Sequence, residues 1–144
     1  MHHPDLSPID FGGMAAIAVG WLERTHPYPK GSVSVPIFLK LMQLLEQPWQ
    51  PAISAGRHPC SFCVMTGGPA SLTYEDTNIT VGAANLFVPA DETIFIAPSL
   101  IAHYIDAHEY LPPTVFLDAV AACSPMRSIE YLRQIARHRR RVTQ

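Results

Sequence analysis

The chain has 144 residues, of which 48% are hydrophobic, and its formal net charge is −2. This length suits one domain that buries its own core, and the hydrophobic content excludes a disordered chain. The small net charge provides no general attraction to nucleic acid or to an anionic membrane, so neither is an expected partner. We therefore predict a single soluble domain over residues 1–144.

The three cysteines are an odd number, and Cys60 and Cys63 form a Cys-x-x-Cys pair. This pattern is unsuited to a disulfide framework and is typical of a metal site or a redox pair in a reducing compartment. The start of the chain lacks the basic residues of a signal peptide, and the apolar run at 14–19 is too short to span a bilayer. We expect a cytoplasmic protein without a membrane segment.

The first part of the chain predicts an extended lead-in over 1–12, a buried strand over about 16–23 and a helix over 34–47. Gly20 favours the strand, because a glycine inside a helix costs about 1 kcal/mol. The helix is predicted by apolar residues at helical spacing and by Pro36, which fits an early helical position.

The middle of the chain predicts short strands, because β-favouring residues alternate there with turn-forming ones. The expected strands are 71–74, 79–81, 86–88 and 93–96. Their spacing suits two hairpins, so we expect a small antiparallel sheet.

Three helices are predicted in the C-terminal part, over about 98–107, 113–122 and 126–138. Pro98 fits the first turn of its helix, and Pro112 and Pro113 break the chain before the next one. The residues of the last helix expected to face the core are Ile129, Leu132, Ile135 and Ala136.

The basic residues at the end of the chain predict a solvated tail over 138–144, with cations that complement the dipole of the preceding helix. Together the elements predict an α+β domain. One helix from the N-terminal half and three C-terminal helices would pack on the small antiparallel sheet.

Two pairs of candidate metal ligands are far apart in the sequence. Cys60 and Cys63 can present two sulfur atoms on one turn, and His103 and His108 have the spacing of a paired-histidine half site. Thiolates and imidazoles are good ligands for Zn²⁺, so the four residues predict a tetrahedral zinc site. The ion would act as a staple between the strand region and the C-terminal helices.

The two histidines cannot both face one ion along a regular helix. Residues five positions apart on an α-helix are related by a rotation of about 500°, so the side chains of His103 and His108 would point about 140° apart. We therefore predict that the helix ends between them, with Pro112 and Pro113 supplying the break.

Alternatives to this ligand set remain open. His58 can replace one of the histidines as a ligand, or it can donate a hydrogen bond from outside the ligand set. Cys60 and Cys63 can also be an unliganded pair, with the histidines in the core or on the surface. Cys123 is expected to be a small buried apolar residue.

Two catalytic interpretations of the cysteine pair lack a necessary part. A proline followed by Cys60 and Cys63 fits half of the zinc nucleoside deaminase signature, but no His-x-Glu sequence precedes it. A thioredoxin-like role requires a helix after the first cysteine, and Gly67 and Gly68 would stop such a helix. A third interpretation is a zinc site with an open metal position and Glu109 as base.

The chain resembles a group of small bacterial proteins of unknown function. The resemblance is carried by Gly-x-His-x-Cys-x-x-Cys at 56–63 and by His-Tyr-Ile-x-x-His-x-Tyr-x-Pro-Pro at 103–113. It implies that both motifs belong to one domain and that the protein is of bacterial origin. It implies no reaction and no substrate.

The favoured interpretation is a zinc-binding protein in which the metal is mainly structural and which serves as an interaction module rather than an enzyme. Four candidate ligands favour a closed site. The alternative is a small zinc-dependent hydrolase-type enzyme with His103, His108 and Glu109 in its site. The partner classes that the sequence leaves open are another protein and a second copy of the chain.

Overall fold

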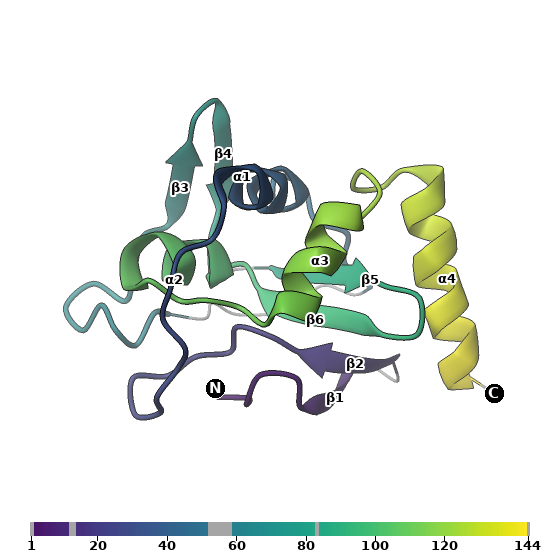
Figure 1. The fold of residues 1–144 in the computed structure, drawn as a ribbon, viewed down its shortest axis with the longest axis horizontal. Coiled ribbons are helices and arrows are strands. Elements are labelled where there is room, and N and C mark those ends of the chain that lie inside the picture. Colours follow the sequence, from purple (N-terminus) through teal and green to yellow (C-terminus); the bar gives the residue numbers. More distant parts are fainter. Residues whose placement is uncertain (1, 12–13, 52–58, 83, 144) are drawn as a thin grey trace.

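The structure is a computed structural model that describes residues 2–11, 14–51, 59–82 and 84–143. Strands form two sheets, and helices pack around the larger one (Figure 1). In chain order the elements are β1 (Pro8–Phe11), β2 (Met14–Ala18), α1 (Val35–Leu44), β3 (Ser71–Tyr74), β4 (Thr77–Thr80), β5 (Asn85–Pro89), β6 (Ile94–Pro98), α2 (Ile101–His108), α3 (Thr114–Ala122) and α4 (Ile129–Thr143).

The larger sheet has four strands in the order β1-β2-β6-β5, and β3 and β4 form a separate two-stranded sheet. Neighbouring strands are antiparallel except β2 and β6, which run parallel with Ile17 opposite Phe95. The α+β class is thus confirmed, but the larger sheet is mixed rather than wholly antiparallel. A parallel pair needs a long crossover connection, and the chain between β2 and β6 supplies one that contains α1 and the smaller sheet.

The helices surround the larger sheet. α1 and α3 contact each other, α3 packs on β5, and α4 contacts β2 and β5. α4 lies at one end of the molecule and α2, which follows β6 closely, lies towards the other (Figure 1). All five residues of β6 are buried, so the core lies around this strand and the helices that cover it. No helix within the described ranges is long and apolar enough to cross a membrane.

β2 ends at Ala18, well before the predicted end near residue 23, because the chain turns sharply at Gly20. The φ angle of Gly20 is 80°, and a Cβ atom there would lie 2.9 Å from Cδ1 of Ile101. Both facts require glycine. After the turn, the Trp21 indole N–H donates a hydrogen bond of 3.0 Å to the Ile96 carbonyl oxygen. The turn therefore holds the N-terminal segment against the first residue of α2.

The other predicted elements are confirmed, with shifts at their ends. Pro98 is an exception, because it was predicted in the first turn of a helix but is the last residue of β6, and α2 begins only at Ile101. α1 begins after Ser34 and has Pro36 in its first turn, as predicted. The four strands of the middle region correspond to β3, β4, β5 and β6. β1 lies inside the segment predicted as an extended lead-in, where it forms the edge of the larger sheet.

α4 presents a different face to the core from the predicted one. Ile135 is buried as expected, but Ile129 and Leu132 are 65% and 42% exposed, and Ala136 is also exposed. Tyr131 and His138 are buried instead. The Tyr131 hydroxyl donates to the Phe87 carbonyl oxygen at 2.6 Å, and His138 Nε2 donates to the Ala90 carbonyl oxygen at 2.9 Å. These bonds satisfy the polar atoms of side chains that the apolar pattern alone would have placed outside.

The helix also continues to Thr143, past the predicted end at about His138. The segment predicted as a basic tail is therefore helical as far as residue 143.

The orientation of α4 predicts unequal effects of two matched substitutions. Ile135→Ala should lower the free energy of unfolding by about 2–5 kcal/mol, because it leaves a cavity in the core. Leu132→Ala should lower it by less than about 1 kcal/mol, because this residue is 42% exposed and its loss leaves no enclosed cavity. Chemical denaturation of the two variants measures both values. Equal losses, or a larger loss for Leu132→Ala, would contradict this orientation.

Candidate metal centre

Cys60 and Cys63 lie on a tight turn that is closed by its own backbone. The Cys63 N–H donates to the Cys60 carbonyl oxygen at 3.3 Å, and the Gly67 N–H donates to the Cys63 carbonyl oxygen at 2.7 Å. The Cys60 N–H donates to the Gly67 carbonyl oxygen at 2.6 Å. These bonds fix the direction of both cysteine side chains.

Two glycines make this turn possible. Gly67 and Gly68 have φ angles of 73° and 98°, a region that other residues rarely adopt. A Cβ atom on Gly68 would lie 2.9 Å from Cβ of Cys60, so any other residue there would push Cys60 out of place. The adjacent glycines that argued against a thioredoxin-like helix therefore have a specific role in placing the first cysteine.

His103 and His108 both belong to α2, which corrects the prediction that the helix ends between them. The helix ends immediately after His108, where Glu109 adopts a left-handed conformation with φ 57°. The N–H groups of Glu109 and Tyr110 both donate to the carbonyl oxygen of Tyr104, a longer reach than the i→i−4 bond of an α-helix. This wider last turn rotates His108 less per residue, which brings it towards the side of the helix that carries His103.

The four predicted ligand side chains come together. Their ligand atoms all lie within 4.8 Å of one another. Cys63 Sγ lies 3.4 Å from His103 Nε2 and 3.6 Å from His108 Nε2, and Cys60 Sγ lies 3.6 Å from His108 Nε2. All three cysteines of the chain are free thiols. The group can therefore hold one metal ion between the turn and α2.

Aromatic side chains cover this group of cysteines and histidines. The Phe62 ring lies 5.0 Å from the His108 ring and also contacts Tyr28 and Tyr104. The Tyr28 hydroxyl donates to the His108 carbonyl oxygen at 2.9 Å, which caps the end of α2. Phe62 lies between the two cysteines, so the sequence places it next to the candidate ligands. Nothing in the sequence indicates that Tyr28 lies there too.

Burial sets the protonation of these side chains in the metal-free protein. Cys60 is 2% exposed and His103 is 6% exposed, while Cys63 and His108 are half-buried. Loss of solvent lowers the pKa of His103, and the neighbouring His108 lowers it further. Burial likewise lowers the pKa of His108 and raises the pKa of the Cys60 thiol. Both imidazoles are thus neutral near pH 7, the form that binds metals, and Cys60 must lose a proton to bind one.

Glu109, the predicted base of the alternative enzyme, is not part of this group. Its side chain lines a separate cavity together with Asp106 and Lys30. Cys123 is also apart from the group, at the end of α3, where burial raises its pKa to about 11. This position fits its predicted role as a small buried residue. His58, the predicted alternative ligand, lies outside the described residues.

Comparison with known proteins provides a family and no activity. A family model described as "Domain of unknown function (DUF7919)" matches residues 1–121, a range that includes all four candidate ligands. No curated protein and no solved structure matches the chain.

Proposed function

We propose that this chain, which belongs to the family of that domain of unknown function, is a zinc-binding protein whose metal is structural. Its ligands are Cys60, Cys63, His103 and His108. The ion joins the Cys60–Cys63 turn to the C-terminal end of α2 and so holds together two segments that are far apart in the sequence.

The observation that carries the proposal is the spacing of the sulfur and nitrogen atoms. Zinc binds cysteine sulfur at about 2.3 Å and histidine nitrogen at about 2.0–2.1 Å in a tetrahedron. The sulfur–nitrogen edge of such a tetrahedron is about 3.6 Å. The three close sulfur–nitrogen distances in the group are 3.4, 3.6 and 3.6 Å. One zinc ion fits among these atoms with little movement of the side chains.

The chemistry of the donor set supports zinc over other common ions. Two thiolates and two imidazoles in a tetrahedral arrangement suit zinc, whereas calcium, magnesium and manganese prefer oxygen ligands. Four protein ligands also complete the coordination of a structural zinc and leave no position for a reactive water. With Glu109 in a separate cavity, the geometry lends no support to the hydrolase alternative.

A protein-binding role is supported by the surface next to the cysteines. Val64 and Met65 directly follow Cys63 and are 68% and 95% exposed. The metal would hold this apolar pair on a rigid turn, where it is presented to solvent. We therefore propose that the protein acts as an interaction module.

Metal analysis of untagged protein, purified without metal-affinity chromatography, tests the zinc assignment. We expect about one zinc ion per chain in the wild type and in His103→Cys, which keeps four ligands. Cys60→Ser and His103→Ala should lose most of the zinc and melt roughly 10 °C or more below the wild type, since loss of a metal is among the largest single-residue effects.

Two control variants match these changes at positions outside the site. Cys123→Ala and His26→Ala each remove a residue of the same type and should keep the zinc. If the ligand variants fail to fold, chelation of zinc from the wild type gives the same test, and it should lower the melting temperature. A wild type that is purified without zinc, or a His103→Ala variant that retains it fully, would refute the assignment.

The protonation of the ligands predicts the pH dependence of zinc binding. Because the pKa of each histidine is lowered, both are already neutral near pH 7 and release no proton. Each cysteine that binds as a thiolate releases one, so zinc uptake should release about two protons and weaken as the pH falls. Calorimetry in two buffers of different ionisation enthalpy measures this number. Cys60→His should reduce it to about one, and a count near zero would contradict thiolate ligation.

A further inference from the structure

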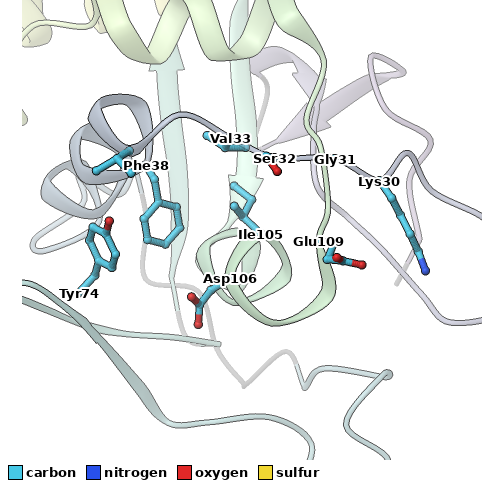
Figure 2. A pocket seen from close by; sticks show the side chains of 10 residues that line it. Lys30, Gly31, Ser32, Val33, Phe38, Tyr74, Ile105, Asp106 and Glu109 are labelled. Carbon is cyan, nitrogen blue, oxygen red and sulfur yellow. The ribbon is translucent and has the colours of Figure 1, made fainter.

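A cavity near the metal centre lies beside α2 and is lined by residues other than the four ligands (Figure 2). Its volume is about 460 Å³, within the range of small-molecule sites. It is bounded by the segment that leads into α1, by the first turns of α1, by the end of β3 and by α2. Its lining residues are Lys30, Gly31, Ser32, Val33, Val35, Phe38, Tyr74, Ile105, Asp106 and Glu109.

One part of the cavity is aromatic and apolar. The rings of Phe38 and Tyr74 meet edge to face, with centroids 4.8 Å apart and planes at 89°. Phe38 is buried and Tyr74 is half-buried, so the rings are held by the fold. Val33 and Ile105 extend this wall (Figure 2). A ligand with an aromatic or aliphatic body can lie against these side chains.

The charges of the cavity are mainly negative. Asp106 lies at the end near Phe38 and Tyr74, and Glu109 lies at the end near Lys30 (Figure 2). Within the part of the chain that the structure describes, neither carboxylate makes an ion pair or a side-chain hydrogen bond. Lys30 also lines the cavity, and its ammonium group is 5.5 Å from the centroid of the ring of Tyr28, which is not a lining residue.

From this arrangement we propose that the cavity binds an organic cation, an ammonium or guanidinium group on an aromatic or aliphatic body. The cation pairs with Asp106, and the body packs on Phe38 and Tyr74. The electron-rich faces of the two rings add to the attraction for a cation. The same chemistry occurs in a free amine and in a lysine or arginine side chain of a peptide. None of the residues that would contact the cation is one of the four candidate metal ligands.

Calorimetric titration of the purified wild-type protein with 2-phenylethylamine tests the inference. We expect a dissociation constant on the order of 1 mM, as is usual for so small a ligand. The neutral analogue 2-phenylethanol and the anionic 3-phenylpropionate have the same ring without the cation. Both should bind at least about 5-fold more weakly, since they lack the pairing with a carboxylate.

Variants locate the binding in the cavity. Asp106→Asn should weaken 2-phenylethylamine binding about 5-fold, to the level of the neutral analogue. Ser32→Trp, which fills the cavity without a change of charge, should abolish it. Asp118→Asn removes an exposed carboxylate on α3 and should leave binding unchanged. An acetylated and amidated Ala-Arg-Ala peptide separates the two sources: tighter binding than the amine indicates a peptide ligand, and weaker binding indicates a free amine.

Three results would overturn the inference. The first is that 2-phenylethylamine shows no saturable binding up to a ligand concentration of about 10 mM, which is 10-fold above the expected dissociation constant. The second is that the neutral analogue binds with equal affinity. The third is that Asp106→Asn and Ser32→Trp bind the amine as the wild type does. Zinc content is measured on the same samples. A variant that keeps its zinc but loses the amine separates a failure at the cavity from a failure of the metal assignment.

Discussion

The contact between the Cys60–Cys63 turn and α2 is the interaction on which the site depends. The turn is closed by short backbone bonds, but residues 59–70 contain no helix or strand that would pair with the larger sheet. Its link to α2 is made by the Phe62 ring, which contacts Tyr104 and His108, and by two thiols and two imidazoles. In the absence of metal these groups offer only sulfur–nitrogen contacts of 3.4–3.6 Å, and a thiol is a weak hydrogen-bond donor. The proposed zinc ion would replace these weak contacts by four coordinate bonds.

The same ion would stabilise the unusual end of α2. The last turn is wider than an α-helical turn and is followed by a non-glycine residue, Glu109, in a left-handed conformation. Such a conformation costs of order 1 kcal/mol or more and persists where the surroundings hold it. His108 is held from one side by the cysteines and from the other by the Tyr28 hydroxyl. Because Ile105, Asp106 and Glu109 line the neighbouring cavity, a metal held by α2 would also stabilise one wall of that cavity.

Local chemistry explains what could be predicted from the sequence. The α+β class and the hairpins followed from turn-forming residues between β-favouring ones, and prolines marked the start of α1 and the break before α3. The meeting of Cys60, Cys63, His103 and His108 also followed from residue type, because few other roles suit two such pairs. Their service as zinc ligands remains a proposal.

What could not be predicted depends on contacts between distant parts of the chain. The parallel pairing of β2 with β6 has no signal in either strand, and the end of β2 is set by the approach of Gly20 to Ile101. The face of α4 that packs on the core is set by hydrogen bonds from Tyr131 and His138 to the carbonyl oxygens of Phe87 and Ala90. A pattern of apolar residues does not predict such bonds. The widened last turn of α2 was missed because a helix end between the two histidines was the only arrangement considered that would bring them together.

Zinc X-ray absorption spectroscopy of the purified wild-type protein tests the central claim most directly, because it reports the atoms that surround the ion. The account predicts two sulfur atoms at about 2.3 Å and two nitrogen atoms at about 2.0–2.1 Å. A coordination shell of nitrogen and oxygen alone, or one with a single sulfur atom, would contradict it.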